Sequence, residues 1–183
     1  CAFVFPGQGS QAVGMGQELL DAFPIARETL EEVDDALGEN LTKLIAGGPA
    51  EDLTLTENAQ PALMAISMAV MRVLEIEGGV NIDKVAAFVA GHSLGEYSAL
   101  AAARSLGVAD TARLLKIRGR AMQKAVPIGE GGMAALLGAK LGQAEEIAGA
   151  AAQGEVCSVA NDNAPGQVVL SGAMEAIDRA IEM

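Results

Sequence analysis

The sequence is poor in aromatic and basic residues. Aromatic residues make up 3% of the 183 positions and tryptophan is absent, while 12 Lys and Arg face 24 Asp and Glu, for a net charge of −12. A nucleic-acid-binding surface needs basic residues on one face and aromatic rings on which bases can stack. We therefore expect no nucleic-acid partner.

Cysteines and long apolar runs are also scarce. The two cysteines, Cys1 and Cys157, are too few for a disulfide framework or a metal cluster, which favours a cytoplasmic location and predicts no bound metal. The longest apolar stretches, such as 62–71, are too short to span a bilayer. We expect no membrane association, and the N-terminal residues do not have the pattern of a signal peptide.

With 51% hydrophobic residues and 22 glycines, the patterning predicts an α/β protein with a sizeable core. The glycine-rich stretch 129–132 marks a boundary between two parts, 1–128 and 129–183. Elements predicted in the first part are a short buried strand at 2–5, helical spacing over 15–38, a helix over 58–77, a strand and a helix within 85–103, and a helix over 108–126. Those predicted in the second are strands at 133–137, 156–160 and 167–171, helices over 143–152 and 174–183, and a polar turn at 161–166. This βαββα order is one strand short of a split-βαβ, ferredoxin-like unit.

The segment Gly91-His92-Ser93-Leu94-Gly95 follows an apolar strand, precedes an Ala-rich helix and fits the G-x-S-x-G nucleophile elbow. In such an elbow the tight turn lifts the serine hydroxyl out of the sheet, so Ser93 is a candidate nucleophile. The alternative is a small residue at a tight strand–helix crossing. His92 is the single histidine, but adjacent elbow residues point away from each other, so it suits a pocket-lining role better than that of general base.

Arg118 is the unusual residue of the predicted helix 108–126. At 100° per residue it falls within an apolar arc that includes Leu114 and Met122. An unpaired guanidinium facing a core costs several kcal/mol, so we expect it to meet an anion. That anion is either an Asp or Glu of the protein or the carboxylate of a substrate, which guanidinium grips in a bidentate manner.

Basic residues cluster around Arg118, since six of the twelve lie between positions 104 and 124. A solvated helix face accounts for such a cluster, and so does a landing site for phosphates or an acidic protein.

Five ordered motifs carry a resemblance to a known family. They are Phe5-Pro6-Gly7-Gln8-Gly9-Ser10-Gln11, Gln60-Pro61-Ala62-Leu63, Gly91-His92-Ser93-Leu94-Gly95-Glu96-Tyr97, Arg118-Gly119 with Met122-Gln123, and Asn161-x-Asn163-x-Pro165-Gly166-Gln167. Together they resemble the malonyl-CoA:acyl carrier protein transacylases of fatty-acid synthesis and the related acyltransferase domains of polyketide synthases. The resemblance implies an α/β-hydrolase-like large subdomain with an inserted ferredoxin-like small subdomain.

The resemblance also implies roles for individual residues. Ser93 matches the serine that accepts the acyl group, and Arg118 matches the arginine that pairs with the free carboxylate of the malonyl group. The main-chain N–H groups of Gln8 and Leu94 match the oxyanion hole. Three further residues are expected to line the pocket, namely His92, Met122 and Asn161. The catalytic histidine of the family has no counterpart here and is expected beyond Met183, together with the last strand of the small subdomain.

The implied reaction moves a malonyl group from CoA to the phosphopantetheine thiol of acyl carrier protein. The CoA thioester and phosphopantetheine are then substrates, no cofactor is bound, malonyl-CoA and acyl carrier protein are the partners, and the complete protein is a monomer. A serine hydrolase or thioesterase, and a non-catalytic fragment that binds carrier protein, are alternatives. The 183 residues alone are expected to expose an unpaired strand edge, to be poorly soluble or partly disordered after about Gly129, and to lack most of the activity.

Overall fold

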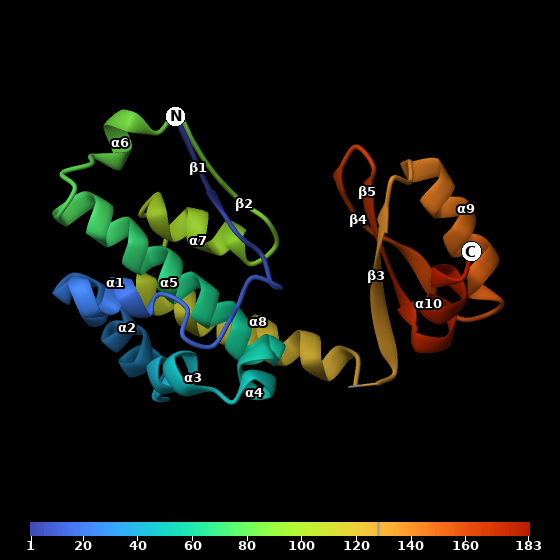
Figure 1. The fold of residues 1–183 in the computed structure, drawn as a ribbon, viewed down its shortest axis with the longest axis horizontal. Coiled ribbons are helices and arrows are strands. Elements are labelled where there is room, and N and C mark those ends of the chain that lie inside the picture. The colour runs from blue at the N-terminus through green and yellow to red at the C-terminus, as the bar shows by residue number, and fades with distance from the viewer. Residues whose placement is uncertain (128) are drawn as a thin grey trace. The chain divides into compact units, whose positions relative to one another are not determined.

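The chain folds as two units, Cys1–Gln123 and Lys124–Met183, each described here by itself (Figure 1). A computed structural model describes residues 1–127 and 129–183. From the N-terminus to Ala125, the elements are β1 (Ala2–Phe5), α1 (Gln17–Ala22), α2 (Pro24–Leu37), α3 (Leu41–Gly47), α4 (Ala50–Thr54), α5 (Thr56–Ile76), α6 (Ile82–Val85), β2 (Phe88–Gly91), α7 (Gly95–Ala102) and α8 (Val108–Ala125). The chain combines helices and strands as the sequence predicts, which confirms a mixed α/β protein.

Helix α5 forms the centre of the first unit. Its apolar side chains, among them Met64 and Leu63, are buried in one core with residues from the neighbouring helices. By length and composition α5 is also the one helix in the described part of the chain that could cross a membrane, and 61% of that stretch is buried inside the protein. The sequence expectation concerned unbroken apolar runs such as 62–71, which are shorter than the whole helix. Burial in the core accounts for the apolar character of α5.

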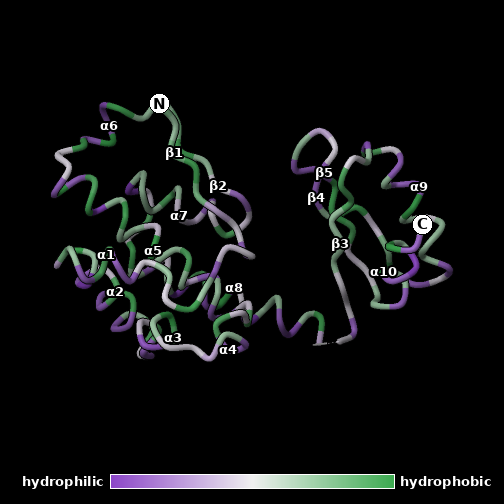
Figure 2. The backbone as a smooth tube through the Cα atoms, viewed as in Figure 1, coloured by the Kyte–Doolittle hydropathy of each residue, from purple (hydrophilic) through white to green (hydrophobic). Residues whose placement is uncertain are grey.

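Strands β1 and β2 pair in parallel, with Phe5 opposite Gly91. Both strands are hydrophobic along their length (Figure 2). Phe5 is buried against the core, whereas Val4 and Phe88 on the opposite face are 75% and 74% exposed. The strand at 2–5 is thus buried on one face only, because no layer within the described residues covers the other.

Helix α8 buries an arc that only partly matches the one that the sequence favours. Leu115 of the predicted apolar arc is buried, together with Thr111 and Gly119, while Leu114 and Met122 of that arc are 42% and 46% exposed. Lys116, expected on the solvated arc, is buried instead. Periodicity defines the two arcs, but the neighbours of a helix decide which arc enters the core.

The second unit contains β3 (Gly131–Leu137), α9 (Leu141–Ala152), β4 (Cys157–Ala164), β5 (Gln167–Ala173) and α10 (Met174–Ile181). Its strands form an antiparallel sheet in the order β3-β5-β4. Alanines of α9 and Ile177 of α10 join Val168 and Leu170 of β5 in a separate core. The polar turn expected at 161–166 is shorter than predicted, because β4 continues through Ala164. Register shifts near Asn161 let that polar segment keep its pairing with β5.

Gly119 marks the closest approach of α8 to α5. A Cβ atom at Gly119 would lie 2.5 Å from the Glu57 Cα and 2.7 Å from the Thr56 carbonyl oxygen. We expect Gly119→Ala to lower the free energy of unfolding by about 1–3 kcal/mol, as overpacking against rigid backbone does. Urea denaturation measures this change. Gly47→Ala is the control in the same unit, because a Cβ there meets no atom within 4 Å. An equal free energy of unfolding for Gly119→Ala and Gly47→Ala would show that α8 can move away from α5 without loss of stability.

Candidate active site

The turn between β2 and α7 has the geometry of a strained elbow. Ser93 has a φ of 54°, in the left-handed region that non-glycine residues rarely adopt. A Cβ at Gly91 would lie 1.9 Å from the Gly95 carbonyl, and a Cβ at Gly95 would lie 2.4 Å from the Phe5 oxygen. Gly91 is therefore required for the close contact of β2 with the start of α7, and Gly95 for the close contact of α7 with the end of β1. The turn leaves the Ser93 side chain exposed at the start of α7.

The side chain of Arg118 reaches this serine from α8. Its Nη2 donates to Ser93 Oγ at 3.2 Å, and its Nη1 donates to Gln60 Oε1 at 2.6 Å. The guanidinium also lies 5.8 Å from the centre of the Tyr97 ring, within range of a cation–π contact. Gln60 is fully buried in α5. These contacts fix a positive charge directly beside the candidate nucleophile.

The sequence predicts that Arg118 meets either an Asp or Glu of the protein or the carboxylate of a substrate. The first alternative is wrong, because among the described residues none of the ion pairs includes Arg118 and its hydrogen-bond acceptors are neutral. The physical reason is that Arg118 is only half-buried and lies on the open arc of α8, so water compensates part of its charge. A carboxylate-sized anion would complete its hydrogen bonds.

The loop after β1 lies against the elbow. Gly7 contacts His92 so closely that a Cβ there would lie 2.6 Å from His92 Nδ1. In the same loop, the Gln8 side chain donates to Thr56 Oγ1 at 3.3 Å. Leu94, the residue after the serine, is buried in the core of the first unit. The structure thus brings the loop that carries Gln8 next to the residues that begin α7.

The residues expected to line a pocket are placed differently from one another. His92 is exposed in the elbow. Met122 Sδ accepts a hydrogen bond from Gln60 Nε2 at 3.3 Å, and the same Gln60 side chain accepts from Arg118. Asn161 belongs to the second unit, where it pairs with Val169 across β4 and β5.

Sequence reasoning gave no role to Gln60, Tyr97 or Thr56, although each contacts a candidate site residue. A signal was available for Gln60, because it is a polar residue at a position of α5 that the helical pattern assigns to the core. No comparable signal marks Tyr97 or Thr56, whose contacts depend on how α5, α7 and α8 meet.

Most of the basic cluster is neutralised by acids of the same chain. Arg104 pairs with Glu75 and Asp83, Arg113 with Asp110, and both Lys116 and Arg120 with Glu39 and Glu57. The hydrogen bond to Glu57 raises the pKa of Arg120 above its usual value. The cluster therefore does not present six uncompensated charges to a partner. Among the described residues, no group of three or more His, Cys, Asp or Glu is placed to hold a metal ion.

Comparison with known proteins shows a relationship along nearly the whole chain. Residues 2–183 match the acyl transferase domain family. The chain is 49% identical over 179 residues to the malonyl CoA-acyl carrier protein transacylase of Escherichia coli K12, which covers 98% of this chain and 57% of that protein. This chain thus spans little more than half the length of that relative.

Solved structures agree with the sequence relationship. An acyl-carrier-protein-S-malonyltransferase from Bartonella henselae superposes with a TM-score of 0.93 at 58% identity, over 99% of this chain and 57% of the other. A malonyl-transacylase solved in complex with a type II polyketide synthase acyl-carrier protein gives a TM-score of 0.91 at 44% identity, over 99% and 57% of the two chains. These matches confirm the resemblance read from the five motifs, and this chain belongs to the acyl transferase domain family.

Proposed function

We propose that the complete gene product transfers a malonyl group from malonyl-CoA to the phosphopantetheine thiol of acyl carrier protein, through a malonyl ester on Ser93. This reaction is a step of fatty-acid synthesis. It is the activity named for the relatives, one of which is solved with a carrier protein. No bound cofactor takes part, since CoA thioester and phosphopantetheine are the substrates.

The observation that carries this proposal is the guanidinium of Arg118 beside Ser93. It is oriented by Gln60, lies 3.2 Å from the serine hydroxyl, and its partners within the protein are neutral. An acyl group on Ser93 that ends in a carboxylate places that carboxylate within reach of the guanidinium. Malonyl fits this requirement, while a plain acyl chain leaves the charge without its anion.

In the first half of the reaction, Ser93 Oγ attacks the thioester carbonyl carbon. The carbon–sulfur bond breaks, the CoA thiolate leaves and takes a proton, and the malonyl group remains as an ester on Ser93. The main-chain N–H groups of Leu94 and Gln8 stabilise the negative charge on the carbonyl oxygen, an interaction whose loss typically costs about 10²–10³-fold in rate. Arg118 stays protonated and only donates hydrogen bonds, so it cannot act as the base. Following the family, we assign the base to a histidine outside these 183 residues.

The second half reverses these steps with a different thiol. The phosphopantetheine sulfur attacks the ester carbonyl, the bond to Ser93 Oγ breaks, and the serine recovers its proton from the conjugate acid of the base. The malonyl group leaves as the thioester of the carrier protein. The enzyme is restored without any net gain or loss of protons or electrons.

We further propose that residues 1–128 are the start of an α/β-hydrolase-like subdomain, and that residues 129–183 form an inserted ferredoxin-like subdomain. Support for the first assignment is the parallel pairing of β1 with β2 and the elbow that follows β2. Support for the second is the order β3-α9-β4-β5-α10 with an antiparallel sheet.

Two other functions are less well supported. A thioesterase uses the same elbow but has no need of a fixed guanidinium at the acyl group. A non-catalytic fragment that binds carrier protein would use the basic cluster, yet Arg104, Arg113, Lys116 and Arg120 are already paired with acids of this chain.

The direct test is transfer of radiolabelled malonyl from malonyl-CoA to purified carrier protein. We expect the complete gene product to label the form that carries phosphopantetheine and to leave the apo form unlabelled, because only the former has the acceptor thiol. Release of the label as free malonate at the same rate with and without carrier protein would identify a thioesterase. Absence of turnover with both forms would leave only a binding role.

A further inference from the structure

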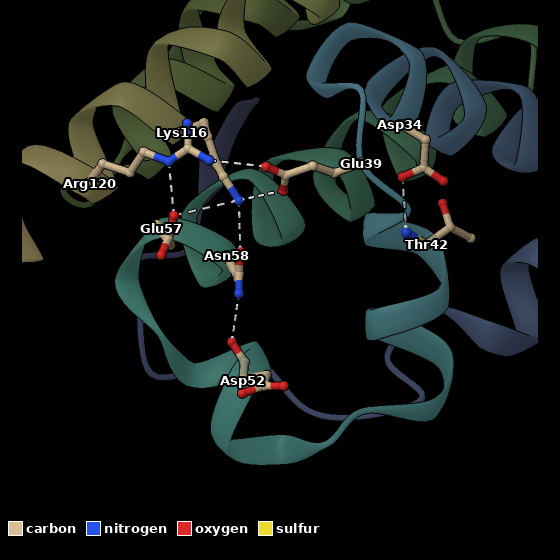
Figure 3. A network of polar contacts seen from close by, with 8 residues as sticks. All are labelled: Asp34, Glu39, Thr42, Asp52, Glu57, Asn58, Lys116 and Arg120. Carbon is tan, nitrogen blue, oxygen red and sulfur yellow. Dashed lines mark hydrogen bonds and ion pairs between the residues drawn. The ribbon is translucent and has the colours of Figure 1, made fainter.

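A cluster of charges around the buried Lys116 joins α8 to the start of α5 (Figure 3). We call it the α5–α8 cluster; its members are Glu39, Glu57, Asn58, Lys116 and Arg120. Lys116 Nζ lies 2.5 Å from Glu39 Oε2, 2.9 Å from Asn58 Oδ1 and 3.8 Å from Glu57 Oε2. Arg120 bridges the same two carboxylates, with Nε 2.9 Å from Glu57 and Nη2 3.0 Å from Glu39. Two cations and two anions are thus held in one closed set of contacts.

Lys116 is the residue that makes this cluster unusual. Its side chain is 7% exposed, and an ammonium group loses several kcal/mol of hydration when it is buried so deeply. A buried ammonium group needs hydrogen-bond acceptors for its N–H groups. Here Glu39 and Asn58 accept hydrogen bonds from two of the three. Buried ion pairs are poor at stabilising a fold but good at fixing one register between elements.

In the sequence of α8, the cationic members of the α5–α8 cluster flank Arg118, the arginine of the candidate site. Lys116 and Arg120 are two residues before and two residues after Arg118 on α8. On α5, Glu57 and Asn58 belong to the same N-terminal segment as Gln60, which accepts from Arg118. The segment that holds the cluster therefore also holds the partner of the guanidinium.

Contact at Gly119 removes the remaining freedom of α8. The helices touch backbone to backbone there, and even a methyl group would overlap Glu57. The ion pairs and this backbone contact involve the same residue of α5, Glu57, and together they fix both the rotation of α8 and its position along α5. A rotation or slide of α8 would move the Arg118 guanidinium away from Ser93 Oγ.

We propose that the α5–α8 cluster positions Arg118 and thereby sets the preference for acyl groups that end in a carboxylate. Lys116 and its partners do not touch the substrate and act through Arg118, so they are positioning residues. This inference rests on the proposed function of Arg118. A cluster that serves stability alone would affect all substrates alike, because it would change only the amount of folded enzyme.

The experiment measures kcat/KM of the complete gene product for malonyl-CoA and for acetyl-CoA, with Lys116→Met as the variant. The ratio of the two values does not depend on the fraction of enzyme that is folded, since both scale with it. We expect the ratio to fall by about tenfold or more, because an error of about 1 Å in placement costs up to about 10²-fold. Acetyl transfer per folded molecule stays unchanged, since acetyl has no carboxylate.

Matched variants make the result specific. Lys124→Met makes the same change at an exposed lysine of α8 and leaves the ratio unaltered. Glu39→Gln removes one charge of the cluster at a half-exposed residue and lowers the ratio in the same direction, by less than Lys116→Met. In a background of Arg118→Ala, Lys116→Met has no further effect on the ratio, because the residue through which it acts is gone.

Two results would overturn the inference in distinguishable ways. If Arg118→Ala changes the ratio but Lys116→Met and Glu39→Gln do not, the cluster has no positioning role and the proposed function stands. If Arg118→Ala itself leaves the ratio unchanged, the proposed function of Arg118 is wrong, and the inference fails with it.

Discussion

Replacement of Ser93 by Ala abolishes malonyl transfer, with an expected loss of about 10⁶-fold in kcat, the scale seen when a serine enzyme loses its nucleophile. The elbow exposes this hydroxyl at the start of α7, where it accepts a hydrogen bond from Arg118. The measurement is intact mass spectrometry after mixing with malonyl-CoA. Wild-type protein carries one malonyl group and Ser93→Ala carries none.

Ser98→Ala is the matched control for this variant. Ser98 lies one turn further along α7, and its buried hydroxyl has no hydrogen-bond partner among the described residues. Its removal leaves activity unchanged and does not lower stability, because no hydrogen bond is lost. A malonyl adduct that persists in Ser93→Ala would show that another residue accepts the acyl group.

Arg118→Ala is expected to lower kcat/KM for malonyl-CoA by about 10²–10³-fold, the cost of removing one partner from a hydrogen-bonded charge pair. Acetyl transfer is retained or improved, because an acetyl group has no carboxylate to pair with the guanidinium. The substitution only removes an unpaired charge beside the bound acetyl group. Steady-state kinetics with the two thioesters measure both effects.

Arg113→Ala provides the control on the same helix. Arg113 is exposed and pairs with Asp110, so we expect its removal to leave kcat/KM unchanged for both malonyl-CoA and acetyl-CoA. Arg118→Lys keeps the positive charge but loses the planar guanidinium. We expect its kcat/KM for malonyl-CoA to lie between the values of wild type and Arg118→Ala. An equal loss for malonyl and acetyl transfer in Arg118→Ala would instead assign Arg118 to the structure of the helix.

The elbow could be predicted from the sequence because all of its determinants are local. An apolar strand, two glycines at fixed spacing and a following Ala-rich helix are contiguous, and the structure shows why each glycine is needed. The helices α5 and α8 were predicted nearly to their observed ends for the same reason, since periodicity and the proline at position 127 are local signals.

The environment of α8 could not be predicted, because it depends on residues far away in the sequence. Periodicity placed Lys116 with the solvated residues, but Glu39 and Asn58, 77 and 58 positions away, make its burial possible. Periodicity likewise placed Arg118 in an apolar arc, which is the more exposed side of the helix. The role proposed for its guanidinium rests on a different ground, namely its hydrogen bonds to Ser93 and Gln60.

A pulse–chase experiment tests the central claim, that Ser93 carries a malonyl group on its way to a thiol. The complete gene product is mixed with radiolabelled malonyl-CoA, freed of excess substrate, and digested for peptide mapping before and after addition of phosphopantetheinylated carrier protein. We expect the label first on the peptide that contains Ser93 and then on the carrier thiol, with none left on the enzyme. Label on a different peptide, or label that passes to water rather than to the thiol, would contradict the account.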